Sequence, residues 1–202
     1  MENREIMAEI QRTIKIEAAF ILKLNEILDA EAVIATVKAI AACKGRIVLT
    51  GCGTSACAAR KAAHSLCCIE RPALFLSPSD AVHGGLGVLQ PDDILILISK
   101  GGNTSELAAM IPTCKTKGAM LIGVTENRES EIARCADIVL IVSVDQEPCR
   151  FNMLATASTL AVIAVFDAIC IALMKATGFS KEQFLVIHPG GAVGMRLQNE
   201  KD

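Results

Sequence analysis

Apolar residues recur every three or four positions over residues 2–29, with charged residues between them. The repeating apolar positions are Ile6, Ile10, Ile14, Ala18, Ile21 and Leu28. This spacing predicts a long amphipathic helix, and a second helix is expected over about residues 31–43. Because the first helix precedes every strand, it cannot connect two strands. Its apolar stripe must therefore cover the domain or pack on another subunit.

Short aliphatic runs without polar alternation then alternate with segments of helical length. The runs span residues 47–49, 73–77, 94–99, 119–125 and 138–142, and the helical segments include 104–117, 129–136 and about 152–177. Strands that are apolar on both faces are typical of a parallel sheet covered by helices. We expect a three-layer αβα sandwich whose five parallel strands have the flavodoxin-like order 2-1-3-4-5.

The chain has the length of one domain, and no Pro-, Ser- or charge-rich linker divides it. We expect a single domain over residues 1–202. Within it, residues 1–44 form the N-terminal helices, residues 45–197 the αβα core with a C-terminal HPGG segment, and residues 198–202 a tail.

Composition narrows the classes of partner. The chain is 52% hydrophobic with a net charge of −2 and has no Trp or Tyr, so nucleic-acid binding is not expected. Asp167 interrupts the longest apolar stretch, which favours a buried core helix over a membrane span. The N-terminus lacks an apolar signal core, so we expect a cytoplasmic protein with reduced thiols. The nine cysteines contain no CxxC pair, and a metal site is not expected.

The sequence RIVLTGCGTSACAARKAA, residues 46–63, reads as strand, glycine loop and helix. Gly51 and Gly53 permit a tight turn, and Thr54 and Ser55 supply hydroxyls. The following helix directs unpaired N–H groups at the loop, which favours an anion such as a phosphate. Any α/β protein needs strand-to-helix turns, so this loop alone is weak support for a binding site.

A second loop of the same kind, ISKGGNTSEL, follows the third strand. In the order 2-1-3-4-5, strands one and three are neighbours whose helices lie on opposite faces, so both loops meet at the switch point. This convergence favours an anion site that includes Ser55, Ser99 and Thr104. Dinucleotide binding would need an acidic residue at the end of the second strand. Leu76 and Ser77 stand there, which argues against NAD.

These residues together resemble the sugar isomerase (SIS) domain family, and most closely its D-arabinose-5-phosphate isomerase branch. The resemblance covers residues 5–197 and rests on GCGTS, ISKGGNTSE, HGGLG at 83–87, VDQEPC at 144–149 and HPGGAVG at 188–194. It implies a cofactor-independent isomerase that converts an aldose phosphate to a ketose phosphate. It also implies a homo-oligomer, usually a tetramer, whose sites borrow residues from neighbouring subunits.

Carried over by position, the resemblance assigns acid–base catalysis to Glu106, Glu147 and His188. It assigns substrate or phosphate binding to Gly51, Gly53, Thr54, Ser55, His83, Ser99, Gly101 and Thr104. Two positions depart from the branch, which carries Lys in place of Thr54 and Ser in place of Gly101. Family members often continue into a pair of CBS domains, and we expect regulation through such domains to be absent from a chain that ends at Asp202.

The chemistry of isomerisation agrees with these assignments. One carboxylate can move a proton between adjacent carbons through an enediolate, and a partly apolar loop is expected to raise the pKa of Glu147 toward neutrality. Opening a cyclic sugar requires a group that titrates near pH 7, such as His188. The His188 tail is expected to reach the crevice of a neighbouring subunit.

Other readings of these residues remain open. Glu147 is also compatible with an ordinary solvated loop glutamate, and His188 with a histidine that merely ends a helix. Glu106 also fits a capping box that begins at Asn103. Lys100 is the basic residue nearest to the missing lysine, and whether it reaches the sugar is an open hypothesis.

The interpretation favoured by the sequence is an isomerase of D-arabinose 5-phosphate and D-ribulose 5-phosphate. One alternative is a phosphosugar-binding module that senses without catalysis. Another is an isomerase of a different sugar phosphate, because Thr54 replaces the lysine of the branch.

Overall fold

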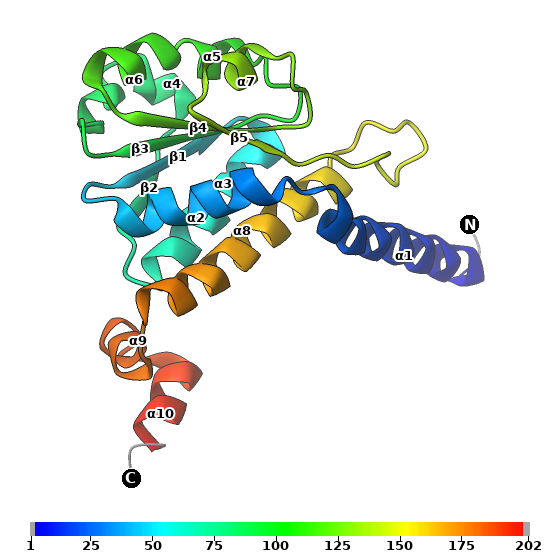
Figure 1. Ribbon diagram of the computed structural model, residues 1–202. Helices are drawn as coiled ribbons and strands as arrows, with labels where there is room; N and C mark the ends of the chain where they lie inside the picture. The colour runs from blue at the N-terminus through cyan, green and yellow to red at the C-terminus, as the bar shows by residue number, and fades with distance from the viewer. Residues whose placement is uncertain (1–2, 200–202) are drawn as a thin grey trace.

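The apolar runs form one parallel sheet in the computed structural model of the chain, which describes residues 3–199. The strands are β1 (Ile47–Gly51), β2 (Ala73–Phe75), β3 (Ile94–Ile98), β4 (Met120–Thr125) and β5 (Ile138–Ile141). Their order is β2-β1-β3-β4-β5 (Figure 1), which confirms the expected topology. β1 pairs with β3 from Ile47 opposite Ile94 to Gly51 opposite Ile98, so the two glycine loops leave the same edge of the sheet.

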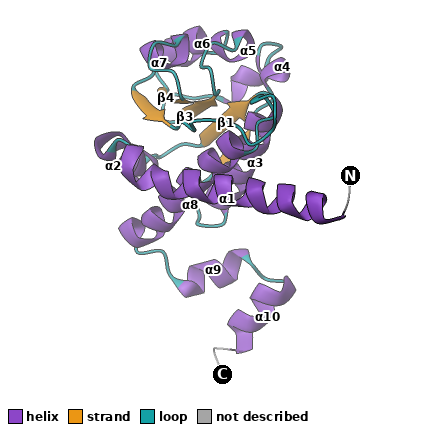
Figure 2. Ribbon diagram, turned by 90° about the vertical axis from the view of Figure 1, so that its right-hand side faces the viewer, coloured by secondary structure: helices purple, strands orange, loops and turns teal. Residues whose placement is uncertain are grey.

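Helices cover both faces of the sheet (Figures 1 and 2). One layer holds α2 (Ala30–Ala42), α3 (Gly53–Cys67) and α8 (Ala157–Thr177), with α1 (Asn3–Ile27) against α8. The other holds α4 (Pro78–Ala81), the 3₁₀ helix η1 (Gly85–Val88), α5 (Ser105–Ala108), α6 (Ile111–Lys117) and α7 (Glu131–Cys135). The chain ends in α9 (Lys181–Ile187) and α10 (Gly191–Asn199), which lie beyond the three layers.

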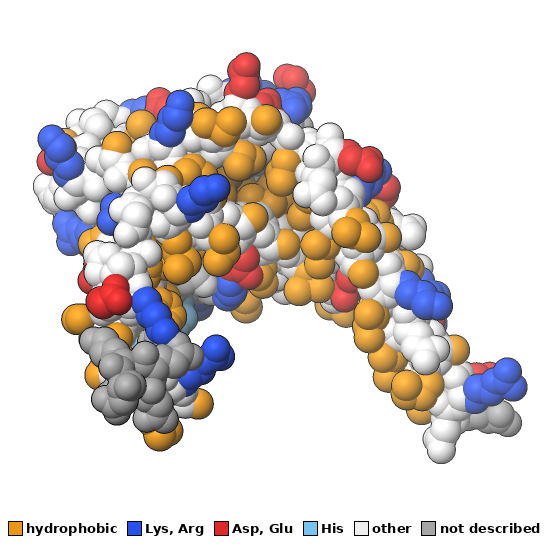
Figure 3. Space-filling view, turned by 60° about the horizontal axis from the view of Figure 1, so that its bottom comes forward, with side chains coloured by type: hydrophobic (Ala, Val, Ile, Leu, Met, Phe, Trp, Pro, Cys, Tyr) orange, Lys and Arg blue, Asp and Glu red, His pale blue; other side chains and the backbone are white. Residues whose placement is uncertain are grey.

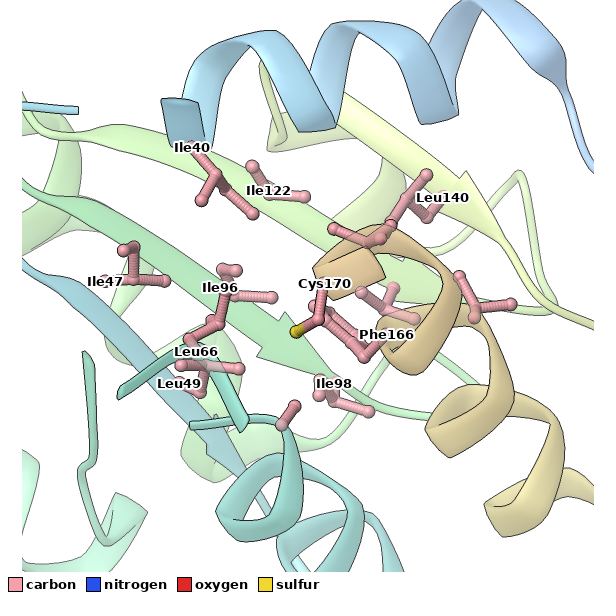
Figure 4. Close-up of a cluster of buried hydrophobic side chains, with 14 of the residues drawn as sticks. Ile40, Ile47, Leu49, Leu66, Ile96, Ile98, Ile122, Leu140, Phe166 and Cys170 are labelled. Atoms are coloured by element: carbon pink, nitrogen blue, oxygen red, sulfur yellow. The ribbon is translucent and has the colours of Figure 1, made fainter. Parts of the chain in front are cut away.

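The hydrophobic core consists of two clusters of side chains, one on each face of the β-sheet, because successive residues of a strand point to opposite faces. Ile94, Ile96 and Ile98 of β3 pack toward α2, α3 and α8. Figure 4 shows Ile96 and Ile98 in the same cluster as Phe166 of α8. Leu95 and Leu97 of the same strand pack toward α5 and α6. All five residues of β3 are buried, which explains why the sequence of this strand shows no polar alternation.

Three helical boundaries differ from the expectation. The segment 104–117 is two helices, because Pro112 enters the first turn of α6 and has no N–H to continue the preceding turn. α8 begins at Ala157, after a loop in which Asn152 has a φ of 55°. α9 and α10 were not expected. α10 includes residues 198 and 199 of the expected tail, and residues 200–202 lie outside the described residues.

The amphipathic helix α1 contacts the domain through part of its surface and leaves many apolar side chains exposed. Leu24 is buried against α8. Lys23 forms an ion pair with Asp145 (2.7 Å), and Arg12 donates a hydrogen bond to the carbonyl oxygen of Pro148 (2.6 Å). The exposed apolar residues of α1 are Ile6, Met7, Ile10, Ile14, Ile21 and Leu22. Figure 3 shows hydrophobic side chains along this arm and across the hollow beside it.

One described helix, α8, is long and apolar enough to cross a membrane by the criteria of length and composition. In this structure it packs against α1, α2 and α3. Phe166 and Leu173 on α8 are fully buried in one hydrophobic cluster, in which Figure 4 shows Phe166. One face of α8 thus lies in the core, while Ile171 on the same helix is 67% exposed.

Candidate functional site

The first glycine loop is a tight turn between β1 and α3. A Cβ atom on Gly51 would lie 2.9 Å from the backbone carbon of Ser55, so the close approach of α3 to the strand requires glycine. Gly53 begins α3 with a φ of 56°, in the left-handed region that favours glycine. Thr54 and Ser55 therefore lie in the first turn of α3, at the helix end that favours anions.

The second glycine loop is held closed by its own hydroxyls. Ser99 Oγ and Thr104 Oγ1 are 2.8 Å apart, and the backbone N–H of Gly102 donates to Ser99 Oγ (3.1 Å). Gly102 has a φ of 68°, and a Cβ there would collide with the side chain of Ser130. Two of the expected binding hydroxyls, those of Ser99 and Thr104, thus lie together at the carboxyl end of β3.

The expected capping box at Asn103 is wrong. Thr104 is the N-cap of α5, and the side-chain oxygen of Asn103 instead accepts the backbone N–H of Glu131 (2.9 Å), which ties the loop to α7. Glu106 is exposed and accepts a hydrogen bond from Ser105 Oγ (3.0 Å). Hydrogen bonds from its own backbone N–H and from Ser105 lower the pKa of Glu106, so this carboxyl is ionised at neutral pH.

Glu147 lies in the loop between β5 and α8, with its side chain fully buried. One carboxylate oxygen, Oε1, accepts a hydrogen bond from the ammonium of Lys100 at 2.8 Å. The other, Oε2, accepts the backbone N–H groups of Thr156 (3.0 Å) and Ser158 (3.4 Å) at the N-terminus of α8. The carboxylate therefore joins the loop after β3 to the start of α8.

The expectation that the pKa of Glu147 is raised is wrong. Burial does raise it, and this is the largest single influence. The hydrogen bonds from Lys100, Ser158 and Thr156, together with the charge of Lys100, outweigh burial and hold the pKa of Glu147 below its ordinary value. A partner 47 positions away in the sequence therefore reverses the direction that the local sequence indicates.

A second carboxyl lies near this ion pair. Glu126 directly follows β4, and its backbone N–H donates to the carbonyl oxygen of Lys100 (3.0 Å). Burial raises the pKa of Glu126, the charge of Lys100 lowers it, and the charge of Glu147 raises it, with a net upward shift. Sequence reasoning missed Glu126, although its place after the apolar run of β4 was a usable signal.

The two loops and the start of α8 meet at a small cavity of ≈ 50 Å³. Its polar lining residues are Thr54, Ser55, Lys100, Thr125, Ser158 and Thr159. Pockets that enclose small molecules usually measure about 300–1,000 Å³, so one chain alone does not enclose a sugar phosphate here. A larger cavity of ≈ 630 Å³ opens at the amino-terminal edge of the sheet, but the expected site residues do not line it.

The two histidines expected at the site do not line the small cavity. His83 occupies an exposed turn between α4 and η1. His188 ends α9, where its ring stacks on Phe184 at 3.9 Å and its Nδ1 lies 3.0 Å from the carbonyl oxygen of Phe184. Glu147 lies in the loop before α8, and His188 follows α9, which comes after α8 in the chain. Figure 1 shows the loop before α8 and helix α9 at opposite ends of α8. A helix of 21 residues is about 30 Å long, so His188 does not reach Glu147 of its own chain.

The sequence profile of the SIS domain family matches residues 40–172 of the chain. The chain belongs to the SIS domain family. This SIS domain is 43% identical to the arabinose 5-phosphate isomerase KdsD of Shigella flexneri over 77% of the chain, and 37% identical to that of Pseudomonas aeruginosa over 97%. The alignments span 47% and 60% of those relatives, so the chain covers only about half the length of the curated proteins it matches.

Two solved structures match this SIS domain over their whole length. A Listeria monocytogenes protein, provisionally named a sugar-phosphate isomerase, is 60% identical with a TM-score of 0.93. The Escherichia coli CFT073 protein c3406, solved in complex with arabinose 5-phosphate, is 29% identical with a TM-score of 0.89. Each alignment covers 94% of this chain and 100% of the other.

The two positions at which a departure from the isomerase branch is expected are both exposed in this SIS domain. Thr54 is exposed and lines the small cavity. Gly101 is exposed, and a Cβ atom there would meet nothing within 4 Å. The backbone therefore does not require glycine at position 101.

Proposed function

We propose that this SIS domain isomerises a sugar phosphate between its aldose and ketose forms, with D-arabinose 5-phosphate and D-ribulose 5-phosphate as the favoured pair. The observation that carries the proposal is the buried Glu147 carboxylate beside two hydroxyl-bearing loops. A domain that only bound phosphosugars would need the loops but not a buried carboxylate beside them. The names of the curated relatives and the sugar-phosphate complex of c3406 support the same substrate class.

The proposed chemistry is a proton transfer through an enediolate. The Glu147 carboxylate removes the proton from C2, the electrons of that bond form the C1–C2 double bond, and the carbonyl oxygen becomes an oxyanion. The carboxylic acid then returns the proton to C1, while the proton on O2 passes to O1. Ser55, Ser99 and Thr104 bind the phosphate, with Gly51, Gly53, Thr54, Gly101 and His83 completing the substrate site. Glu106 and His188 supply acid–base groups for oxygen proton transfer and ring opening.

We propose that a second copy of the chain completes each site, within a homo-oligomer expected to be a tetramer. His188 lies about the length of α8 away from its own Glu147. The small cavity does not enclose a ligand, and the apolar side of α1 is exposed beside a hollow (Figure 3). A neighbouring chain seated on this face would cover the apolar side chains and could bring its own His188 to the site.

Subunit mixing tests this assembly. His188→Ala and Glu147→Ala chains are each expected to be inactive, and mixed oligomers are expected to regain part of the activity after dissociation and reassembly. The mixture must be shown to contain both chains in one oligomer by native mass spectrometry. Mixed oligomers with no more activity than their parents would exclude a shared site.

A panel of pentose and hexose phosphates tests the function itself. Aldose–ketose exchange is followed by NMR, and the melting temperature is measured with each phosphate and with the matching unphosphorylated sugar. We expect exchange with arabinose 5-phosphate and thermal stabilisation only by phosphorylated sugars. Stabilisation without exchange for every sugar would favour the sensing module, which Thr54 in place of lysine makes the second candidate. Equal stabilisation by phosphorylated and unphosphorylated sugars would exclude a phosphate site.

The cysteines bear on where this reaction takes place. All nine are free thiols, two of them buried and the others partly or fully exposed. Free thiols on the surface suit a reducing compartment, and we propose that the protein acts in the cytoplasm.

A further inference from the structure

Lys100 is the exposed member of its ion pair with Glu147, and it lines the small cavity that Glu147 does not line. The Glu147 side chain is 0% exposed, whereas the Lys100 side chain is 38% exposed. Lys100 also lines the small cavity together with Thr54 and Ser55, and it carries the positive charge among the described residues that line it. A ligand held by the loop hydroxyls would therefore meet the ammonium of Lys100 before it met the carboxylate.

The ion pair makes Glu147 a weak base. An ammonium at 2.8 Å from Oε1 stabilises the ionised carboxylate, and a carboxylate with a lowered pKa accepts a proton poorly. If the ammonium moved away, the two backbone N–H groups would still orient Oε2, but burial would then raise the affinity of the carboxylate for a proton. Proton abstraction from carbon is favoured by this second state.

The side chain of Lys100 can rotate, whereas its backbone is held in place by hydrogen bonds. The carbonyl oxygen of Lys100 accepts hydrogen bonds from Thr125 Oγ1 (2.9 Å) and from the backbone N–H of Glu126 (3.0 Å), which anchor its backbone. Its side chain is a flexible four-carbon stem that ends in a compact charge with three rotatable donors. A rotation of this stem can transfer the ammonium to a nearby anion without displacing the loop.

We propose that Lys100 is the substrate-facing cation of this site and exchanges partners when the sugar phosphate binds. In the free protein the ammonium holds the Glu147 carboxylate. In the complex it binds the negative charge of the substrate, at the phosphate or at the enediolate oxygen, and leaves Glu147 free to accept the C2 proton. Lys100 thereby supplies the positive charge that Thr54 cannot. This inference rests on the proposed isomerase function.

Other charged groups lie near the Lys100–Glu147 ion pair, so their titration must be distinguished from that of Glu147. Glu126 follows β4 beside Lys100, and its pKa responds to both members of the pair. From α1, Arg12 binds the carbonyl oxygen of Pro148, the residue after Glu147. A Glu126→Gln variant assigns the second carboxyl, and a Glu147→Gln variant assigns the first.

The test measures the titration of the Glu147 carboxyl and turnover in the same protein. The carboxyl carbon of Glu147 is followed by ¹³C NMR in uniformly glutamate-labelled protein, with and without saturating D-arabinose 5-phosphate. In the free wild-type protein the midpoint is expected below that of an ordinary glutamate. With the sugar phosphate present it is expected to rise by about one pH unit or more, a change that corresponds to losing a nearby positive charge.

Two variants of Lys100 sharpen the test. Lys100→Met removes the charge, so turnover is expected to fall about 100-fold and the midpoint should already be high without ligand. If this variant does not fold, Lys100→Arg tests the exchange of partners instead. A guanidinium binds a carboxylate through two parallel hydrogen bonds, so it should stay on Glu147 when the ligand binds. The arginine variant is expected to fold, to lose at least about tenfold in turnover, and to keep a low midpoint with ligand.

Lys115→Met is the matched control. Lys115 pairs with Asp137 at 2.7 Å and is 42% exposed, but it lies at the opposite edge of the sheet. This variant is expected to keep its turnover and its ligand-dependent midpoint. The proposed partner exchange would be overturned, with the isomerase function retained, by either of two results. One is a Glu147 titration midpoint in the wild type that does not change when the ligand binds, and the other is full turnover in Lys100→Arg. A midpoint shift without turnover would refute the isomerase function and retain Lys100 as a ligand-binding cation.

Discussion

A buried carboxylate lies at each of the two edges of the sheet where strands begin and end, and the two carboxylates differ in their hydrogen-bond donors. At the amino-terminal edge, Asp93 accepts the backbone N–H groups of Arg46 (2.6 Å) and Gln90 (2.8 Å), one on each oxygen, and the Arg46 guanidinium lies farther away, at 3.7 Å from Oδ2. At the carboxyl edge, Glu147 has backbone donors on one oxygen only, and its other oxygen is held by the flexible side chain of Lys100.

This difference separates a structural carboxylate from a candidate base. Backbone donors cannot leave without unfolding the local chain, so Asp93 fixes the loop before β3. A side-chain donor can leave, so Glu147 can change its environment while the fold stays intact. Burial alone therefore does not mark the site, although Asp93 and Glu147 are 2% and 3% exposed. The larger cavity lies beside Asp93, which shows that cavity size does not mark it either.

The sharpest contrast is expected between Glu147→Gln and Asp93→Asn. Glu147→Gln should lower turnover about 10²–10⁴-fold, because the amide cannot accept the C2 proton. Asp93→Asn should leave turnover within about twofold but lower the free energy of unfolding by about 1–3 kcal/mol, since its NH₂ group would face a backbone N–H. Steady-state kinetics and urea unfolding on both variants measure the contrast. An active Glu147→Gln enzyme would remove this residue from the mechanism.

The next largest effect concerns the loop that carries Ser99 and Lys100. Gly102→Ala is expected to lower the free energy of unfolding by roughly 2–4 kcal/mol, because alanine is strained at a φ of 68° and its Cβ would collide with Ser130. Gly101→Ala is the matched control, with an expected change within about 0.5 kcal/mol, because its Cβ enters open space. Thermal unfolding measures the loss of stability in both variants. An equal loss in the two would contradict a destabilising collision between the Cβ atom at position 102 and Ser130.

Much of this picture follows from sequence, and the exceptions have physical causes. The strand runs could be predicted because parallel strands buried on both faces remain apolar at every position. Ser55 and Ser99 could be predicted because neighbouring strands place their loops together. Two signals were readable but missed, namely Pro112 as a helix break and Ser180 with Gln183 as the capping box of α9.

The lowered pKa of Glu147 could not be predicted from the local sequence. It depends on Lys100, which comes from the loop after β3, and on the amides at the start of α8. Only the packing of three separate segments brings these groups together. The separation of His188 from Glu147 likewise depends on the direction in which α8 crosses the domain.

Acid is expected to weaken the carboxyl edge through Glu147. Its pKa is lowered in the folded protein, so the stability it contributes is complete above the pKa of an unfolded glutamate, about 4.3. That stability is lost as the pH falls through the lower folded-state pKa. Wild type is expected to exceed Glu147→Gln by about 1–2 kcal/mol at pH 7, with the gap closing below about pH 4, in urea unfolding series. A gap that stays constant from pH 7 down to the pH at which the protein unfolds in acid would mean that charge does not cause it.

The smallest effect expected is chemical and leaves the fold intact. Backbone N–H groups of Leu154 and Met153 lower the pKa of the Cys149 thiol at the carboxyl edge, whereas burial raises the pKa of the Cys43 thiol at the amino edge. Cys149 should therefore react with iodoacetamide several-fold faster than Cys43 at about pH 7.5, because the thiolate is the nucleophile. Peptide mass spectrometry after short pulses gives both rates. Faster labelling of Cys43 would contradict the assigned difference.

In the proposed assembly, α8 links two active sites, so its length bears on both of them. Its first turn supplies the amides that hold Glu147, and its far end leads into the segment that carries His188. Over about 30 Å, a tilt of about 2° displaces the far end by about 1 Å, and a misplacement of about 1 Å can cost a reaction about 100-fold in rate. Substitutions where α8 rests on α3, such as at the ion pair of Lys61 with Asp167, would then change turnover in a neighbouring subunit without touching either set of reacting groups.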